Sequence, residues 1–147
     1  MAADPLKLAD FLCFAVYSTG HAFNRVYKKL LAPLGLTYPQ YIVMVALWEK
    51  DGVTVGEIGE RLLLESNTLT PLLKRLDAAG LVRRERDTGD ERQVRIRLTE
   101  RGRALETKAS GISHELLCAS GMPEKELRKL TGEIVTLREA LLSHAAE

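Results

Sequence analysis

Cysteine is scarce in this 147-residue sequence, which contains only two. Small secreted proteins that are held together by disulfides need more, so that class is excluded. No export signal is recognisable, and polar residues interrupt the N-terminal apolar stretch at Asp10, His21, Asn24 and Arg25. We therefore expect reduced thiols, a cytoplasmic location and no membrane partner.

An overall excess of charge is also missing, because the formal net charge is only +1. The charges are unevenly distributed, however. From Lys74 to Arg103 there are ten Lys or Arg against six Asp or Glu, a net +4, while the remainder has eleven against fourteen, a net −3. A local positive excess suits a phosphate-binding surface, although a solvated charged face is the alternative. With 46% hydrophobic residues, the chain can form one compact domain with its own core.

Residues 53–98 have the pattern of a helix, a turn, a second helix and two strands. Thr54 and Glu57 have the spacing of a capping box at the start of the first helix. Apolar residues at helical spacing predict its core-facing stripe. This stripe is Val55, Ile58 and Leu62.

The second helix is predicted to start within residues 66–68, whose side chains can all cap a free N–H group. Pro71 favours the later start, because proline is tolerated only in the first turn of a helix. Gly80 should end this helix in the left-handed conformation. The predicted buried stripe is Leu69, Leu72, Leu73 and Leu76.

The opposite face of the second helix is polar and predicts contacts to double-stranded DNA in the major groove. Its candidate DNA-binding residues are Ser66, Asn67, Thr68, Thr70, Lys74 and Arg75, with Pro71 beside them. Gln93–Leu98 then alternates apolar residues with arginines, as in a strand that follows a polar hairpin loop over residues 87–92. The candidate DNA-binding residues of this wing are Arg84, Arg86, Asp90, Arg92 and Arg95, and Arg92 is expected to enter the minor groove.

Long helices flank this module. Asp4-Pro5 predicts the start of a helix that runs from Leu6 to about Leu31. Residues 37–40 form a second capping-box pattern before a helix that is apolar on all sides, and Tyr41 and Trp48 are expected to be core residues of it. Thr99 should cap a further helix with apolar residues at heptad spacing. These residues are Leu105, Ala109, Ile112 and Leu116.

The segment 120–123 should break that helix, and a last helix follows. Its apolar residues are spaced 3, 4, 3, 4, the seam of helices that pack on helices. They are Leu127, Leu130, Ile134, Leu137 and Leu141. The predicted fold is mainly α with a small β-wing: one winged helix-turn-helix domain, residues 1–147. Residues 37–99 would bind DNA, and residues 4–36 and 100–145 would form a homodimer interface that holds two recognition helices roughly 34 Å apart.

The two cysteines allow more than one interpretation. Cys13 lies more than two turns from the predicted helix start, outside the reach of the helix dipole. No Lys or Arg lies within four residues of it, and Asp10 opposes a thiolate, so a small buried hydrophobe is the alternative to a reactive thiol. Cys118 could equally be a core thiol at a helix end. His114 and Cys118 have the spacing of half a metal site, but no second pair exists, and we expect no metal and no cofactor.

The chain resembles the MarR group of winged-helix repressors and, within it, the organic hydroperoxide resistance regulators. The resemblance rests on LCFAVYSTGHAFNRVY, LTYPQYIVMVALWE, ESNTLTPLLKRLDAAGLVRRERDTGDERQVRIRLTERG and Cys118. It implies that organic hydroperoxide oxidises Cys13 and so releases the repressor from DNA. It also implies that Tyr17, Tyr27 and Tyr38 surround this cysteine, and that Cys118 closes a disulfide between subunits.

The positions of the tyrosines fit a site shared between two subunits. Tyr17 is four residues from Cys13 and within reach on one helix. Tyr27 is 14 residues from Cys13, roughly 21 Å along a helix axis, so it would reach this thiol most simply from the partner subunit. Nothing in the sequence alone decides whether Cys118 pairs within or between subunits.

Three function classes follow. The first is a redox-sensing repressor that binds an inverted-repeat operator. The second is a MarR-type repressor released by a non-covalent phenolic or apolar effector. The third, an enzyme using Cys13 as a peroxidatic thiol, lacks supporting Thr or Arg residues nearby and leaves the helix-turn-helix unexplained, so we expect no enzyme.

Overall fold

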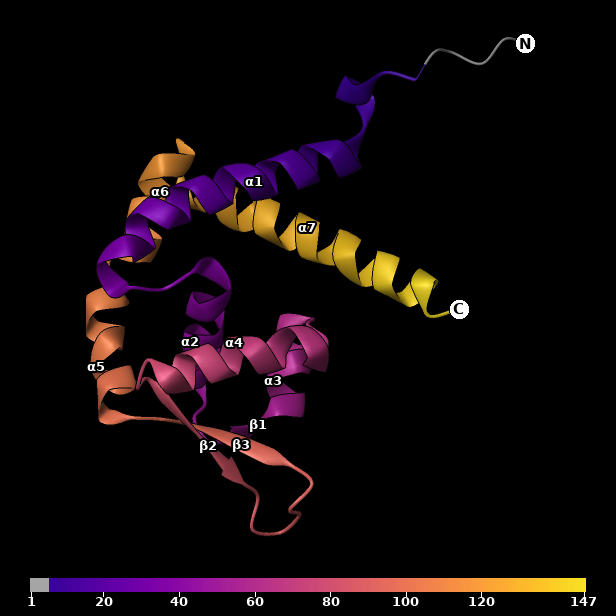
Figure 1. The fold of residues 1–147 in the computed structure, drawn as a ribbon. Coiled ribbons are helices and arrows are strands. Elements are labelled where there is room, and N and C mark those ends of the chain that lie inside the picture. Colours follow the sequence, from indigo (N-terminus) through magenta and orange to yellow (C-terminus); the bar gives the residue numbers. More distant parts are fainter. Residues whose placement is uncertain (1–5) are drawn as a thin grey trace. The chain divides into compact units, whose positions relative to one another are not determined.

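The computed structural model describes residues 6–147, which divide into two compact units, one ending at Ser110 and the other spanning Gly111–Glu147 (Figure 1). Most of the chain is helical, and three short strands form one antiparallel sheet. The prediction of a mainly α fold with a small β-wing is therefore confirmed.

The first unit contains nearly all of the core. Its elements are η1 (Leu8–Asp10), α1 (Leu12–Leu31), η2 (Ala32–Leu34), α2 (Tyr38–Glu49), β1 (Val53–Thr54), α3 (Val55–Leu62), α4 (Ser66–Ala78), β2 (Val82–Arg86), β3 (Val94–Leu98) and α5 (Glu100–Ala109). Helix α2 packs against α1, α3, α4 and α5, and it is apolar on all sides because it lies at the centre. Its buried residues are Tyr41, Val43, Met44, Ala46 and Leu47.

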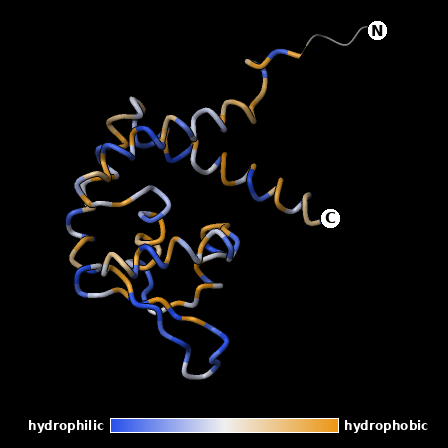
Figure 2. The backbone as a smooth tube through the Cα atoms, in the orientation of Figure 1, coloured by the Kyte–Doolittle hydropathy of each residue, from blue (hydrophilic) through white to orange (hydrophobic). Residues whose placement is uncertain are grey.

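The sheet has the order β1-β3-β2, with β3 in the middle. Ile96 of β3 lies opposite Val53 on one side and Arg84 on the other, and its side chain is fully buried. Strand β1 was not predicted, because two residues are too few to show an alternating pattern. It joins the segment before α3 to the hairpin of β2 and β3, whose polar connecting loop is visible in Figure 2.

The capping boxes hold as predicted. Thr37 accepts a hydrogen bond from the Gln40 N–H, and Thr54 accepts one from the Glu57 N–H, while each Gln or Glu side chain accepts the N–H of its capping residue. Thr99 likewise accepts the Gly102 N–H at the start of α5.

The start of the first long helix differs from the prediction. Helix α1 begins at Leu12, because Phe11 is extended (φ −89°, ψ 111°) and separates α1 from the short helix η1. The predicted cap at Asp4-Pro5 lies outside the described residues. The helix is therefore shorter than expected, and Cys13 is its second residue.

Helix α4 also starts differently. Its first residue is Ser66 and its N-cap is Glu65, which makes no side-chain capping bond. The preference for a later start was wrong, since Pro71 lies inside the helix, at its sixth position. An internal proline removes one N–H from the helical hydrogen bonds, and here the four buried leucines of the stripe hold the helix together despite this loss.

The second unit consists of α6 (Ile112–Ser120) and α7 (Glu124–Ala145). The single helix predicted from Thr99 to Ser120 is interrupted after Ala109, where Ser110 turns its hydroxyl back to the Thr107 carbonyl and glycine follows at 111. The predicted break at residues 120–123 is confirmed. Among the described residues of α7 none is buried, so its apolar seam is uncovered in the single chain.

No single helix among residues 6–147 is long and apolar enough to cross a membrane. The bent pair Leu12–Leu34 and Tyr38–Glu49 meets the length and composition requirement only when the two segments are taken together, and α2 within it is a core helix.

Candidate nucleic-acid interface and cysteine site

Helix α4 has the two faces that the sequence predicts. Leu69, Leu73 and Leu76 are fully buried or nearly so, and Leu72 is buried beside them. The exposed face holds the predicted polar residues, of which Thr70 is half-buried. The exposed ones are Ser66, Asn67, Thr68, Lys74 and Arg75, with Pro71. Within residues 6–147, Lys74 and Arg75 form no ion pair, so both cations are free to meet phosphates.

The end of α4 is fixed by a left-handed turn. Gly80 has φ +74°, as predicted, and its N–H donates to the Asp77 carbonyl at 2.9 Å. The Leu81 N–H donates to the Leu76 carbonyl at 3.1 Å, which completes a Schellman motif. This turn leads directly into β2, so the direction of the helix and the direction of the wing are set by the same few hydrogen bonds.

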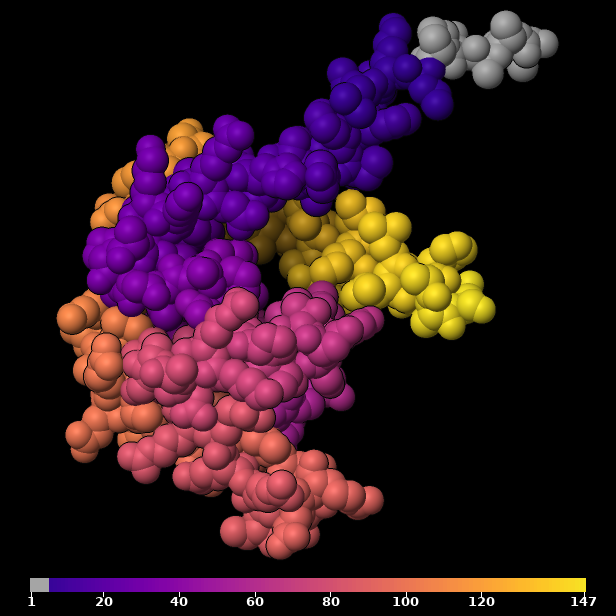
Figure 3. Space-filling view, in the orientation of Figure 1, coloured from indigo at the N-terminus to yellow at the C-terminus, as the bar shows by residue number. Residues whose placement is uncertain are grey.

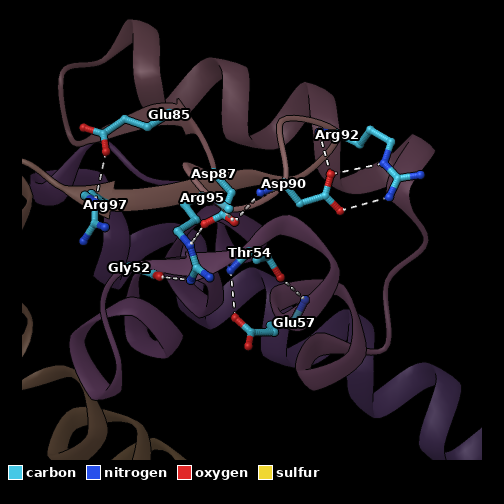
Figure 4. Close-up of polar contacts among 10 residues, drawn as sticks. Gly52, Thr54, Glu57, Glu85, Asp87, Asp90, Arg92, Arg95 and Arg97 are labelled. Atoms are coloured by element: carbon cyan, nitrogen blue, oxygen red, sulfur yellow. Dashed lines mark hydrogen bonds and ion pairs between the residues drawn. The ribbon is translucent and has the colours of Figure 1, made fainter.

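The base of the wing depends on Arg95 (Figure 4). Its Nη1 donates to the Gly52 carbonyl at 2.8 Å, and its Nε pairs with the Asp87 carboxylate. The hydrogen bond from Arg95 lowers the pKa of Asp87, and the same carboxylate raises the pKa of Arg95. Arg95 therefore joins both strands of the wing to the segment before α3, a structural contact that its predicted role in DNA binding did not include.

Asp51 and Asp87 were missed by the sequence interpretation. Asp87 also accepts the Gly89 and Asp90 N–H groups at 3.2 and 3.0 Å, which folds the loop of the wing. Asp51 accepts the Leu98 N–H at 2.9 Å and pairs with Arg103 at 3.0 Å. An aspartate before or within a turn that contains glycine often accepts hydrogen bonds from nearby backbone N–H groups, and both Asp51 and Asp87 have this position in the sequence.

The tip of the wing presents Arg92, whose side chain is 91% exposed. Its Nε and Nη2 donate to the two carboxylate oxygens of Asp90 at 3.1 and 3.4 Å, so Asp90 orients the guanidinium (Figure 4). Arg84, Arg86 and Arg92 line one open hollow of about 380 Å³, together with Glu85, Glu91 and Val94. In the space-filling view the wing projects beyond the body of α3 and α4 (Figure 3).

Arg84 differs from the other wing arginines. It lies opposite the buried Ile96, and its Nε is buried with no hydrogen-bond partner within residues 6–147. Arg86 is exposed at the end of β2. The structure therefore brings Arg84, Arg86 and Arg92 to one hollow of the wing, with Asp90 paired to Arg92, whereas Arg95 is tied to Gly52 and Asp87.

Cys13 is exposed in the single chain, so it is not a core residue of its own subunit. The expectation that it lies outside the reach of the helix dipole is wrong, because α1 begins one residue earlier, at Leu12. The free N–H groups of a first helical turn favour an anion. Asp10, in the preceding short helix, opposes this effect.

The predicted sensor tyrosines lie in two places. Tyr17 is 65% exposed on α1, and its ring meets that of His21 edge-on, with centroids 4.5 Å apart. Tyr27 and Tyr38 have centroids 4.5 Å apart, and Tyr41 lies 5.8 Å from Tyr27. We call Tyr27, Tyr38 and Tyr41 the tyrosine cluster.

Burial, with smaller contributions from Tyr38 and Tyr41, raises the pKa of Tyr27 to about 12. The Tyr27 phenol is therefore protonated at neutral pH and can donate a hydrogen bond. Cys13 and Tyr27 both lie on α1, 14 residues and roughly 21 Å apart along its axis, so within one chain Tyr27 does not meet this thiol.

The tyrosine cluster lines an open hollow of about 320 Å³ that extends to α3. Its other lining residues are Ile42, Val45, Ala46, Glu49, Arg61 and Leu62. Arg61 of α3 pairs with Glu49 and donates to the Ala46 carbonyl at 3.1 Å. The cluster therefore shares a wall with the first helix of the helix-turn-helix.

Cys118 is exposed in the single chain and lies in the last turn of α6. Its Sγ lies 3.8 Å from Nε2 of His114, one turn earlier. No group of three or more metal-ligating residues is found among residues 6–147. A half metal site at His114 and Cys118 thus gains no further ligands from this part of the chain.

Comparison with known proteins identifies the family. A family model described as transcriptional regulator SarA/Rot matches residues 25–108. The chain is 51% identical over 142 residues to the HTH-type transcriptional regulator TtmR of Methylorubrum extorquens, covering 97% of this chain and 73% of TtmR. It is 43% identical over 138 residues to the organic hydroperoxide resistance transcriptional regulator of Bacillus subtilis, covering 94% of each.

Among solved structures, AbfR of Staphylococcus epidermidis is similar in three states. Reduced AbfR bound to DNA matches with a TM-score of 0.76 and 38% identity, covering 91% of this chain and 93% of AbfR. Overoxidised AbfR bound to DNA matches with a TM-score of 0.76 and 39% identity, covering 95% of this chain and 95% of AbfR. AbfR with its disulfide formed matches with a TM-score of 0.60 and 38% identity, covering 88% of this chain and 91% of AbfR.

These relatives are transcriptional regulators and not enzymes, and the matches span more than half of the chain in the family model and nearly all of it in the relatives. The chain therefore belongs to the SarA/Rot family of transcriptional regulators, within the MarR-like winged-helix group.

Proposed function

We propose that this regulator is a redox-sensing repressor that binds an inverted-repeat operator as a reduced homodimer in the cytoplasm. Organic hydroperoxide oxidises Cys13, a disulfide to Cys118 of the partner subunit follows, and the operator is released. The observation that carries the proposal is the exposed Cys13 thiol in the first turn of α1, in one compact unit with the tyrosine cluster and the winged helix-turn-helix.

The DNA contacts follow from the exposed surfaces of α4 and the wing. Asn67, Thr70 and Lys74 would contact base edges and phosphates in the major groove. Arg92, exposed and oriented by Asp90, would enter the adjacent minor groove. In this proposal Ser66, Thr68, Arg75 and Arg86 reach the DNA backbone, whereas Arg84 and Arg95 act by supporting the wing.

A homodimer is supported by apolar side chains that the single chain leaves exposed. Leu12, Phe14, Val16 and Phe23 are between 38 and 58% exposed on α1. On α7 the exposed apolar residues are Leu130, Ile134, Val135, Leu141 and Leu142. Exposed apolar side chains repeated along a helix mark an interaction site, here on one helix of each unit, and a second copy of the chain is the partner that a two-fold symmetric operator requires.

The chemistry needs two steps. The Cys13 thiolate sulfur attacks the terminal oxygen of the hydroperoxide, the O–O bond breaks, and the alkoxide leaves and takes up a proton, which yields an alcohol and Cys13 sulfenic acid. The Cys118 sulfur of the partner subunit then attacks the sulfenic sulfur, and the S–O bond breaks with loss of water. A phenol donor from the tyrosine cluster of the partner subunit would stabilise the Cys13 thiolate before the first step.

The states of AbfR support the second step as the releasing one. AbfR is bound to DNA both reduced and overoxidised, and this chain matches those two states better than the disulfide-formed state, with TM-scores of 0.76 against 0.60. Oxidation of the thiol without a disulfide would then leave this protein on its operator. Closing a disulfide requires Cα atoms about 4.4–6.8 Å apart. If the reduced dimer holds Cys13 and Cys118 further apart than this, the helices that carry them must move when the bond closes.

Mixed dimers test the pairing between subunits. A Cys13→Ser subunit still holds Cys118, and a Cys118→Ser subunit still holds Cys13, so a heterodimer of the two can form only one disulfide, and only between subunits. Cumene hydroperoxide should convert this heterodimer to a covalent dimer on non-reducing electrophoresis, and neither variant alone should become covalent. A wild-type protein that forms only intrachain disulfides, with no covalent heterodimer, would refute the pairing.

The open hollow beside the tyrosine cluster supports a second candidate function, release by a bound phenolic or apolar effector. Its volume of about 320 Å³ lies within the range of small-molecule sites. Cumene hydroperoxide and salicylate should be compared in one DNA-binding titration of the Cys13→Ser variant. Release by salicylate and not by hydroperoxide would favour the effector, and the redox proposal predicts that neither compound releases this variant.

A further inference from the structure

His114 and Cys118 form a contact that the proposed switch does not use. Both lie on α6, four residues apart, and the Cys118 Sγ is 3.8 Å from the His114 Nε2. Both side chains are exposed, so the thiol is accessible to an electrophile and the imidazole ring to water. The two side chains are on the same face of α6, as residues four apart in a helix are.

The helix dipole places the two cysteines of the chain in opposite environments. Cys13 lies in the first turn of α1, where an anion is stabilised, whereas Cys118 lies in the last turn of α6, where an anion is opposed. The carbonyl of Cys118 accepts the Gly121 N–H at the end of this helix. The side-chain neighbour of the Cys118 thiol within α6 is the imidazole of His114.

His114 is in the right place to act on this thiol. Its Nε2 lies one turn before Cys118 and 3.8 Å from the Cys118 Sγ, and an imidazole nitrogen is a common proton acceptor in proteins. We propose that His114 is the general base that deprotonates Cys118 when this cysteine resolves the sulfenic acid. The inference rests on the proposed redox function, and it adds a residue to the second step of the switch.

Atoms and electrons are conserved in this resolving step. His114 Nε2 takes the proton from the Cys118 thiol, and the resulting thiolate sulfur attacks the sulfenic sulfur of Cys13. The S–S bond forms as the S–O bond breaks, and the leaving hydroxide takes the proton from the imidazolium as water. The Cys118 sulfur is oxidised and the Cys13 sulfur is reduced, so no further oxidant is needed beyond the hydroperoxide that made the sulfenic acid.

The expected size of the effect follows from thiol ionisation. An ordinary cysteine thiol, with a pKa of about 8.5, is only about 3% thiolate at pH 7. A base that supplies the thiolate at the moment of attack can therefore raise the rate by up to about 30-fold. Removal of His114 should slow the reactions of Cys118 by about 10-fold to 30-fold at this pH.

The test isolates Cys118 in the full-length Cys13→Ser protein. The probe is 4,4′-dithiodipyridine, a small neutral disulfide that the thiolate attacks. Adding His114→Ala should slow the reaction about 10-fold or more, and free imidazole in the buffer should restore it. The matched control is His144→Ala, a replacement of an exposed histidine on α7 paired with Glu147, which should leave the rate unchanged. A His114→Ala rate within twofold of its parent, or a loss that imidazole does not restore, overturns the proposal.

A second measurement separates this inference from the proposed function. In the protein with both cysteines, His114→Ala should leave the rate of Cys13 sulfenic acid formation by cumene hydroperoxide unchanged, as trapped by dimedone, and should slow only disulfide formation. If no sulfenic acid forms at Cys13 even in the parent, the redox function fails while the dithiodipyridine result still reports on His114. Equal rates of disulfide formation in the parent and in His114→Ala would refute the role of His114 and leave the proposed redox function standing.

Discussion

Replacement of Gly102 by alanine tests how closely α5 must approach the end of α4. Gly102 is buried in the first turn of α5. A Cβ atom at this position would lie 2.1 Å from the Leu81 carbonyl oxygen and 3.1 Å from its carbon. Since Leu81 completes the turn that ends α4, the obstacle is backbone and cannot rotate away.

The magnitude is set by two opposing effects. Overpacking of a filled site lowers the free energy of unfolding by about 1–3 kcal/mol, and alanine in place of glycine in a helix raises it by about 0.5–1 kcal/mol. Because the overlap at 2.1 Å is with backbone, the upper end of the overpacking cost applies, and the net loss in the free energy of unfolding should be about 2 kcal/mol, or roughly 4–8 °C in Tm for a chain of this length. The Trp48 Nε1 donates to the Gly102 carbonyl at 2.9 Å, so Trp48 fluorescence should change as well.

Gly132→Ala in α7 is the matched control. No atom lies within 4 Å of a Cβ built at Gly132, so the same chemical change should stabilise the protein by about 0.5–1 kcal/mol. Urea unfolding followed by circular dichroism, at one protein concentration, measures both variants. A Gly102→Ala protein as stable as wild type would refute the close approach of α5 to Leu81.

Three shorter predictions concern the wing and the tyrosine cluster. Arg92→Ala should weaken operator binding by about 5-fold to 150-fold, equivalent to about 1–3 kcal/mol, without changing the urea midpoint; unchanged affinity would exclude the wing tip from the interface. Tyr27→Phe should remove the phenol that ionises near pH 12 in an alkaline absorbance titration. The same variant should slow Cys13 oxidation while preserving DNA binding by the reduced protein. An unchanged oxidation rate would exclude this phenol from the sensor. Because the folded-state pKa of Asp87 is lowered, its contact with Arg95 contributes stability at neutral pH that is lost below about pH 4. Asp87→Asn should make the loss of stability with falling pH less steep. An equally steep loss in the variant would show that other groups cause it.

The features that were predicted correctly from the sequence are local ones, which depend on residues close together in the chain. The leucine stripe of α4, the two capping boxes and the left-handed Gly80 were all found from spacing, because each is decided within one or two helical turns. The strand pattern of the wing was predictable for the same reason.

Contacts between distant segments could not be predicted in this way. Arg95 and Arg92 look alike in the sequence, three residues apart, yet Arg95 contacts the Gly52 carbonyl 43 positions earlier, while Arg92 is exposed. No local pattern distinguishes the supporting arginine from the exposed one. The contact of Trp48 with Gly102 depends on the packing of α2 against α5 and is equally invisible in the sequence.

The start of α1 shows how a small local error changes the chemistry. The apolar residues from Leu6 onwards suit a helix, and a break at Phe11 leaves no obvious mark in the sequence. Moving the helix start to Leu12 places Cys13 in the first turn, where the dipole favours an anion. The position of Cys13 relative to the free N–H groups of α1 therefore differs between the predicted helix and the structure.

The most direct test of the redox mechanism is operator binding by the Cys13→Ser variant in the presence of organic hydroperoxide. Fluorescence anisotropy with a labelled operator should be recorded for the reduced wild type and the variant before and after addition of cumene hydroperoxide. We predict that both bind the operator at first, that only the wild type is released, and that dithiothreitol restores its binding. A Cys13→Ser protein that leaves the operator on hydroperoxide treatment would contradict the mechanism.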